Sequence, residues 1–335
     1  MALRDIRGQE QAVLLLQKAL SSARLAHAYL FYGPQGIGKK LTALQFAKAL
    51  ACAQGTTDAC ERCPSCRKVT AGNHPDLIYV GPEGNAIRIE HIRTIQRQLG
   101  YKPYESPRTI IILDGCELFT PPAANAVLKT LEEPPETALL LLVTSKKEAL
   151  PLTIVSRCQQ IAFRRLPTAH VQALLEHQGV DRQTAMLAAT LTDGSLSLGN
   201  QADIAQMLGN RQQVYTLLQE QTRPPTTPLF LQARPLAGTR EQCDEILRWL
   251  MLFCRDLVML KISPTLTLYN QDLQAELLSL AQRLSTQDLL RLFTSLEQLR
   301  GYLAMNANTQ LTLEQALVQF RQVMEANRAP INHAV

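Results

Sequence analysis

The stretch of sequence that decides the fold runs from residue 28 to residue 51 and reads AYLFY (28–32), GPQGIGKK (33–40) and LTALQFAKALA (41–51). The first run is apolar and aromatic and predicts a buried strand, whereas the last has the spacing of a helix. Between them stands a Gly-x4-Gly-Lys loop, whose backbone N–H groups can hold phosphates while the lysine reaches the terminal ones. The stretch therefore predicts a P-loop that binds nucleotide through Gly33, Gly36, Gly38 and Lys39, although a glycine turn without a ligand has the same spacing.

Apolar runs of strand length recur as far as residue 163, namely LIYV (77–80), TIIILD (109–114) and ALLLLVTS (138–145). Helical patterns separate them, and this alternation is typical of a parallel sheet flanked by helices. After Leu166-Pro167 three short helical patterns (168–178, 181–191, 197–208) precede a proline-rich stretch (221–235) and four long amphipathic patterns. We therefore expect an α/β P-loop domain over 1–165, a small helical domain over 166–210 and an all-helical domain over 211–335.

Composition narrows the class of protein further. With 335 residues, 46% of them hydrophobic and 19% charged, the chain can bury more than one core and does not have the composition of a disordered protein. Its N-terminus, MALRDIRGQEQ, lacks the apolar segment of a signal peptide, and no run of 18 apolar residues follows. We therefore expect a cytoplasmic protein without membrane contact. The net charge of +5 and the short basic pairs Lys146-Lys147 and Arg164-Arg165 do not by themselves indicate nucleic-acid binding.

Two positions needed for ATP hydrolysis depart from the usual P-loop pattern. The residue after Lys39 is normally a Ser or Thr whose hydroxyl binds Mg²⁺, but here it is Lys40, which would repel the cation. Asp114 ends a strand where a carboxylate can hold Mg²⁺ through water, but Gly115 replaces the Glu that orients the attacking water in hydrolysing members of the fold class. Glu117 is interpreted as an ordinary surface acid. We therefore expect a degraded site that binds ATP without efficient turnover or binds no nucleotide, with an impaired Mg²⁺ site.

Four of the eight cysteines lie close together, as Cys52-x7-Cys60-x2-Cys63-x2-Cys66. In a reducing cytosol such a cluster binds metal more often than it forms disulfides, and four thiolates can close a tetrahedral Zn²⁺ site. We therefore predict a structural zinc site with these four ligands, in a module inserted at about residues 52–66. An iron–sulfur cluster uses the same ligands and stays an alternative, as do free cysteines. His74 is interpreted as a hydrogen-bonded loop residue rather than a ligand.

A longer stretch, AANAVLKTLEEPPETALLLLVTSKKEALPLTIVSRCQQIAFRRL (123–166), resembles the AAA+ clamp-loader proteins of bacterial DNA polymerase III. The four-cysteine module shows the same resemblance, as do IRGQEQAVLLLQKAL (6–20), ARLAHAYLFYGPQGIGK (23–39), NHPDLIYV (73–80) and NANTQLTLEQALVQF (306–320), so that it covers nearly the whole chain. It implies an AAA+ domain, a small lid domain and a helical collar that joins other clamp-loader subunits, gamma/tau and delta, in a hetero-pentamer. That complex would use ATP to load the sliding clamp onto primed DNA during replication.

The resemblance also implies roles for individual residues. Arg157, in the motif Ser156-Arg157-Cys158, would act as an arginine finger on ATP bound by a neighbouring subunit, unless it forms only a surface or interdomain salt bridge. Thr144 and Ser145 fall where the family keeps a polar residue that senses phosphate, although either could cap a helix. The segment Gly194-Ser195-Leu196-Ser197 carries no arginine where the motor subunits have one.

Three functions remain open at this point. They are a non-hydrolysing assembly subunit of the clamp loader, an ATPase motor of the gamma/tau type, and a zinc-bearing protein that binds nucleic acid. Lys40, Gly115 and Ser197 argue against the motor, and the sequence has no basic stripe to support the third function. Within the family these departures favour the delta-prime type of subunit, a component of the DNA polymerase holoenzyme with no expected ATPase activity of its own.

Overall fold

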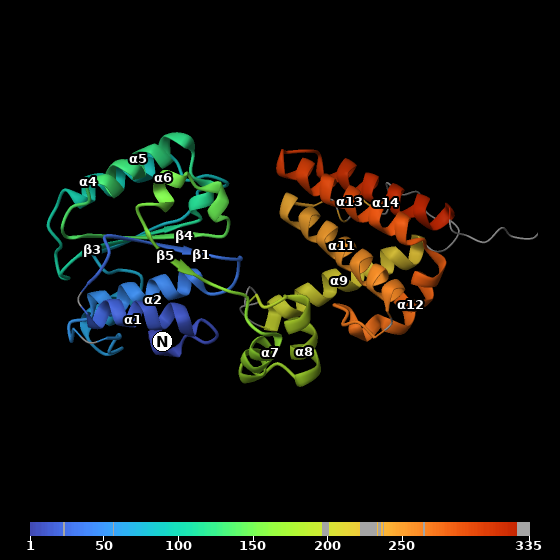
Figure 1. Ribbon diagram of the computed structural model, residues 1–335, viewed down its shortest axis with the longest axis horizontal. Coiled ribbons are helices and arrows are strands. Elements are labelled where there is room, and N and C mark those ends of the chain that lie inside the picture. The colour runs from blue at the N-terminus through green and yellow to red at the C-terminus, as the bar shows by residue number, and fades with distance from the viewer. Residues whose placement is uncertain are drawn as a thin grey trace, which may run out of the picture. The chain divides into compact units, whose positions relative to one another are not determined.

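A computed structural model of the protein describes residues 1–22, 24–55, 57–195, 201–221, 233, 236, 238–263 and 265–326. The chain divides into two compact units, which are described separately below (Figure 1). The first unit holds Met1–His177 and Thr192–Ser197, and the second holds Gln178–Leu191 and Leu198–Val335. Among the described residues, no helix is long and apolar enough to cross a membrane.

The first unit is built on a five-stranded sheet in which every strand pair is parallel. The strand order is β2-β3-β4-β1-β5, and the strands are β1 (Ala28–Tyr32), β2 (Leu77–Val80), β3 (Thr109–Asp114), β4 (Ala138–Thr144) and β5 (Gln159–Ala162). The bounds of β1, β2, β3 and β4 agree with the apolar runs of the sequence to within one residue. The strands β1, β3 and β4 are buried along their length, and a strand buried on both faces reads as a continuous apolar run. The predicted parallel α/β fold is therefore confirmed.

Helices cover both faces of this sheet (Figure 1). Alternate residues of β1 enter different cores: Tyr29 and Phe31 pack with α1 (Glu10–Ser21) and α2 (Lys39–Ala51), while Leu30 packs with α4 (Ile89–Leu99) and α5 (Pro121–Glu132). Successive side chains of a strand point to opposite faces, so one short strand supports two hydrophobic cores. The P-loop strand is thereby held rigidly between the two helical layers.

Several shorter elements complete the first unit. They are η1 (Leu3–Asp5), α3 (Pro64–Thr70), η2 (Cys116–Leu118), η3 (Lys147–Ala149), α6 (Leu152–Val155) and α7 (Thr168–His177). Arg157 lies between α6 and β5 in the sequence. Parallel strands end at one edge of the sheet, so the loops after β1, β3 and β4 emerge together, which is where such sheets place their ligand sites.

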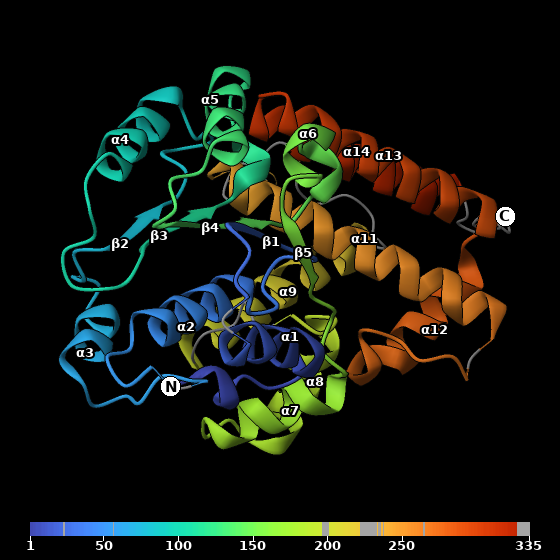
Figure 2. The ribbon, with the colours of Figure 1, turned by 60° about the vertical axis from the view of Figure 1, so that its left-hand side comes forward.

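The described part of the second unit is all helical, which confirms the helical C-terminal region. Its elements are α8 (Arg182–Leu191), α9 (Gln201–Gln221), α11 (Arg240–Ile262), η4 (Gln271–Leu273), α12 (Gln274–Arg283), α13 (Thr286–Ala304) and α14 (Thr309–Ala326). The central helix α11 packs against α9, α12, α13 and α14, and buries Leu247, Leu250 and Phe253 along its length (Figure 2). Of the proline-rich stretch 221–235, only its first residue and Ala233 are among the described residues.

One buried carboxylate fixes the loop that enters β3. Asp76, which is 5% exposed, accepts hydrogen bonds from the backbone N–H groups of Tyr104 (2.6 Å), Glu105 (2.7 Å) and Ser106 (2.7 Å). Burial alone would raise the pKa of Asp76, but these backbone bonds outweigh it, and the pKa lies below its ordinary value of 3.8. The charged form of Asp76 is thus the form that stabilises the fold.

Replacement of Asp76 by Ala should therefore lower the free energy of unfolding by about 2–4 kcal/mol at pH 7, because three backbone donors lose a charged acceptor. A group whose pKa is lowered in the folded chain contributes in full above its ordinary pKa of 3.8 and loses that contribution as the pH falls further. Urea unfolding of Asp76→Ala and of the exposed control Glu136→Ala at pH 7 and pH 3 measures this. A deficit for Asp76→Ala that is as large at pH 3 as at pH 7 would contradict it.

Candidate functional site

The loop between β1 and α2 has the backbone of a phosphate-binding loop. Gly33, Gly36 and Gly38 have φ values of 142°, 74° and 90°. This region of backbone conformation is unfavourable for residues that carry a Cβ atom. At Gly33 a Cβ would lie 2.2 Å from the backbone oxygen of Phe163, so only glycine fits there. Within the described residues, the N–H groups of Gly36, Ile37 and Gly38 donate no hydrogen bond. The loop therefore presents free donors in front of the first turn of α2, as a phosphate site requires.

Lys39 is buried at the base of this loop, with 7% of its surface exposed. Its ammonium donates to the backbone oxygen of Gly33 at 2.7 Å and also to that of Pro34. Burial lowers the pKa of Lys39, whereas the carboxylates of Glu117 and Asp114 act in the opposite direction. A phosphate that enters the loop would offer this ammonium a charged partner in place of the two carbonyls.

The residue after it, Lys40, contacts the carboxylate that was expected to hold Mg²⁺. Its Nζ lies 3.6 Å from Oδ2 of Asp114 and 4.3 Å from the centre of the Tyr79 ring. Tyr79 also donates its hydroxyl to Oδ2 of Asp114 at 2.8 Å. Burial alone would lower the pKa of Lys40, but Tyr79 and Asp114 outweigh it and raise that pKa. The carboxylate at the end of β3 therefore already has a cation and a phenol as partners.

Glu117 is not the ordinary surface acid that we expected. Gly115 turns the chain with a φ of 80° into η2, and Glu117 becomes half-buried. Its carboxylate accepts hydrogen bonds from the Thr144 hydroxyl (2.8 Å), the Ser145 N–H (3.1 Å) and the Ser145 hydroxyl. Burial alone would raise the pKa of Glu117, but these bonds outweigh it and hold the pKa below its ordinary value of 4.5. Thr144 and Ser145 thus bind an acid from the neighbouring strand end rather than cap a helix.

Arg157 follows α6 and forms contacts within its own unit. Its guanidinium lies 2.8 Å from the carboxylate of Glu132, the last residue of α5, and donates to the backbone oxygen of Thr153 at 3.0 Å. The side chains of the pair are 36% and 49% exposed. An ion pair with this exposure contributes little to stability, so the guanidinium can exchange Glu132 for another anion at low cost.

The glycine–serine segment after α8 returns to the P-loop within the first unit. Leu166 donates its N–H to the backbone oxygen of Gly194 at 3.1 Å, and the Ser195 hydroxyl lies 3.3 Å from the backbone oxygen of Gln35. The segment is therefore placed beside the loop, as its counterpart in a nucleotide site would be. Ser197, where the motor subunits have an arginine, lies outside the described residues.

The four cysteines converge at the other end of α2. Cys52 caps the C-terminus of α2, Cys63 caps the N-terminus of α3, and Cys66 lies in the first turn of α3. All four sulfurs lie within 4.8 Å of one another, and those of Cys60 and Cys66 are 4.0 Å apart. Zn–S bonds of about 2.3 Å place the sulfurs of a tetrahedral site about 3.8 Å apart. The residues therefore fit one Zn²⁺ ion with only small side-chain shifts.

The chemistry of this donor set also suits a metal. A hydrogen bond from the backbone N–H of Arg62 lowers the pKa of Cys60 to about 6, so that this thiol is ionised at neutral pH. Burial raises the pKa of Cys66 to about 12, and a bound cation would displace its proton. His74 is buried and bonded to Ser65 and to the N–H of Asp76, in agreement with its interpretation as a structural loop residue.

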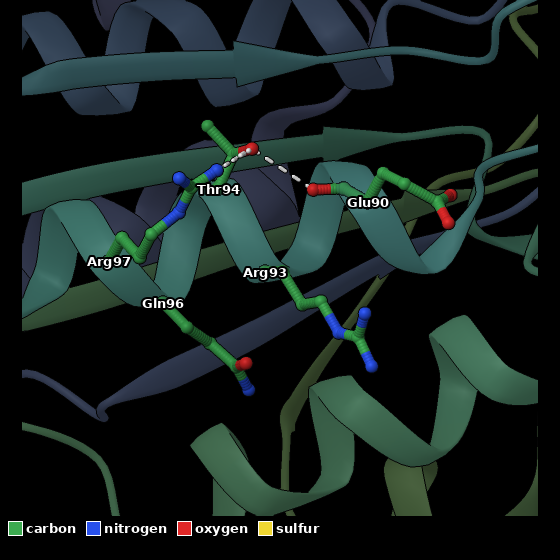
Figure 3. A pocket seen from close by; sticks show the side chains of 5 residues that line it. All are labelled: Glu90, Arg93, Thr94, Gln96 and Arg97. Carbon is green, nitrogen blue, oxygen red and sulfur yellow. Dashed lines mark hydrogen bonds between the residues drawn. The ribbon is translucent and has the colours of Figure 1, made fainter.

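A hollow on α4 is separate from these residues (Figure 3). It is lined by Glu90, Arg93, Thr94, Gln96 and Arg97, all from this helix. Gln96 is held by the backbone oxygen of Ala126 and the hydroxyl of Thr130 on α5. None of the P-loop or cysteine residues lines the hollow, so it is not part of the candidate site.

Comparison with known proteins identifies the family. Residues 8–167 match the family described as DNA polymerase III, delta subunit, and residues 205–322 match the family described as DNA polymerase III, delta subunit, C terminal. The chain belongs to the clamp-loader family of DNA polymerase III. The resemblance of residues 123–166 and of the flanking segments is thereby confirmed.

Individual relatives agree with this family. The chain is 29% identical over 319 residues to DNA polymerase III subunit delta' of Bacillus subtilis. The aligned residues cover 94% of this chain and 96% of the relative. It is 35% identical over 209 residues to subunit tau of the same organism, but spans only 37% of that protein. The fold resembles that of a DNA polymerase III gamma subunit-related protein of Thermotoga maritima, with a TM-score of 0.54 and 19% sequence identity. The superposition covers 92% of this chain and 99% of the Thermotoga chain.

The cysteine geometry yields a test of the predicted zinc site. The purified protein should carry one Zn²⁺ ion, and Cys63→Ser should lose the metal together with stability, because metal affinity adds to the free energy of folding. Elemental analysis measures the zinc content, and thermal unfolding measures the stability. Cys158→Ala, which changes a buried cysteine outside the cluster, should keep the zinc. Iron with sulfide, or no metal in the wild-type protein, would refute the zinc site.

Proposed function

We propose that this chain is a delta-prime-type subunit of the clamp loader, which assembles with gamma/tau and delta subunits and does not hydrolyse ATP itself. The complex would use ATP bound by its motor subunits to load the sliding clamp onto primed DNA in the bacterial cytoplasm. The observation that carries the proposal is the contact of Lys40 and Tyr79 with Asp114, since it engages the carboxylate that a motor subunit needs for Mg²⁺.

The residues of this site do not fit a catalytic Mg²⁺ ion. The hydroxyl expected after Lys39 is replaced by the Lys40 ammonium, and Asp114 is bonded to Lys40 and Tyr79. Gly115 has no side chain to orient a water molecule, and the Glu117 carboxylate is bonded to Thr144 and Ser145. We therefore assign no hydrolytic step to the chain. This departure, together with similarity to subunit delta' along 94% of the chain, favours the delta-prime type over the gamma/tau motor.

The chain would contribute in two ways to the complex. Residues 1–165 would form the AAA+ domain, 166–210 the lid and 211–335 the collar that joins the other subunits. Arg157 would complete the active site of a neighbouring motor subunit, where a guanidinium stabilises the charge that develops on the transferred phosphate. The weak, partly exposed pair with Glu132 would hold the guanidinium until that phosphate is in place.

The isolated, zinc-loaded chain should hydrolyse ATP no faster than background, because cation placement and water orientation are both impaired. A coupled phosphate-release assay measures this, with a gamma/tau subunit as the positive control. Turnover near or above about 1 per second, an ordinary enzyme rate, would instead identify the chain as a motor of the gamma/tau type.

Arg157→Ala should leave the chain folded, zinc-loaded and able to assemble, but should lower the DNA- and clamp-stimulated ATPase of the reconstituted complex. Loss of an arginine finger costs on the order of 10³-fold at the site that it serves, so the total rate should fall in part if other motor sites use other fingers. Arg157→Lys should not restore the rate, since an ammonium lacks the planar fork of a guanidinium.

The matched control is Glu132→Gln, which breaks the same ion pair but leaves the guanidinium in place. If Arg157 served only as half of a salt bridge, both variants would behave alike in ATPase and in thermal stability. The proposal expects the ATPase to fall only with Arg157→Ala. Gel filtration checks that both complexes assemble. Equal ATPase rates for the wild-type and Arg157→Ala complexes would contradict the proposal that Arg157 acts on ATP bound by a neighbouring subunit.

A further inference from the structure

The P-loop retains the groups that bind phosphate but not those that bind Mg²⁺. Gly36, Ile37 and Gly38 have free N–H groups within the described residues, and the buried ammonium of Lys39 has only two backbone oxygens of the loop as its hydrogen-bond partners. These donors need no metal to hold a phosphate. The loss of the metal ligands therefore does not by itself remove the phosphate site.

Lys40 supplies a cation in the place where a P-loop normally holds Mg²⁺. It occupies the position of the hydroxyl that ligates the ion, and its Nζ lies 3.6 Å from the carboxylate of Asp114, the acid that would hold the hydrated ion. Tyr79 fixes this arrangement from two sides, because its ring lies 4.3 Å from the ammonium and its hydroxyl bonds Asp114. Lys40 carries this charge at neutral pH in any case, and, despite burial, Tyr79 and Asp114 raise its pKa further above the ordinary value of 10.5.

Because of the charges around the loop, the Lys40 ammonium and a Mg²⁺ ion exclude each other beside Asp114. Asp114 cannot give its full charge to a hydrated Mg²⁺ ion while Lys40 and Tyr79 occupy Oδ2, and a divalent ion would lie close to the Lys40 ammonium. Glu117 cannot take over as a metal ligand without giving up its bonds to Thr144 and Ser145. A phosphate chain that arrives without metal brings no second cation to the loop, and it meets the ammoniums of Lys39 and Lys40.

We propose that this loop binds the diphosphate of a nucleotide without a divalent metal, with the Lys40 ammonium in the place of Mg²⁺. Lys39 and the loop N–H groups hold one phosphate, and Lys40 neutralises the other. The bound nucleotide is a structural ligand of the non-hydrolysing subunit proposed above, and it is released rather than cleaved. The proposal extends that function but fails separately from it, because the role of Arg157 does not require a nucleotide in this loop.

Calorimetric titration of the full-length, zinc-loaded chain with ADP tests this proposal. Binding in buffer freed of Mg²⁺ with a chelating resin before the protein is added, which leaves the zinc site loaded, should be at least tenfold tighter than binding in a large excess of MgCl2, because the Mg²⁺ complex of ADP competes with Lys40. Lys39→Ala should abolish binding in both buffers. The control Lys18→Ala, on the exposed face of α1, should match the wild-type protein.

Lys40→Thr restores the hydroxyl of a metal-binding P-loop and should reverse the preference, with tighter binding in MgCl2 than in the Mg²⁺-free buffer. Lys40→Met keeps most of the length of the side chain without its charge and should weaken binding in the Mg²⁺-free buffer at least tenfold. Zinc content and thermal unfolding establish that each variant is folded. If only one of these two Lys40 variants folds, the ADP affinity of that variant alone tests the role of Lys40.

Two results would overturn the proposal. The first is a wild-type chain that binds ADP more tightly with MgCl2 than in the Mg²⁺-free buffer, since Lys40 would then not replace the metal. The second is no binding of ADP in either buffer, which would leave the loop as a structural turn. Neither result bears on the ATPase of complexes that contain Arg157→Ala, so the proposed clamp-loader function is tested independently.

Discussion

The parallel register of β1 between β4 and β5 is the constraint on which the rest of the first unit depends. Tyr32 lies opposite Thr144 on one side and Ala162 on the other, and Asp114 lies opposite Val143, so that these strands end at the same level. The loops that follow them must then share one edge of the sheet. The P-loop, the Asp114 carboxylate and the Thr144 hydroxyl meet there only because this register holds.

Much of this arrangement can be predicted from the sequence, for a physical reason. Strands buried on both faces give continuous apolar runs, so β1, β3 and β4 appear at their observed places, and the short apolar run of the partly buried β2 does as well. The loss of the metal-binding hydroxyl at Lys40 can also be predicted from the sequence, because that hydroxyl follows the glycines of the loop at a fixed spacing in the chain. The cysteine spacing gives the metal ligands in the same way, as the convergence of the four sulfurs agrees with it.

The partners of these residues could not be predicted, because they depend on the order of the strands in space. Tyr79 reaches Asp114 because β2 pairs with β3, a pairing that no local pattern states. The sequence around Glu117 predicts only a surface acid, since nothing in it shows that β4 lies beside β3 and brings Thr144 and Ser145 to this carboxylate. The ion pair of Arg157 with Glu132 likewise joins the segment after α6 to the end of α5, and β4 and η3 lie between these two helices in the sequence.

The two ends of α2 carry the two chemical centres of the chain. Gly38 caps the start of the helix and Cys52 caps its end, and Lys48 forms an ion pair between the last turn and Glu61 in the cysteine loop. The helix has 13 residues and so spans about 20 Å between the phosphate loop and the metal site. One inserted or deleted residue would turn the far end by about 100° and move it by about 1.5 Å, and Cys52 would then point away from its fellow ligands. Both centres therefore fix the length of α2, and during divergence of this family we expect its residues to change in kind but not in number.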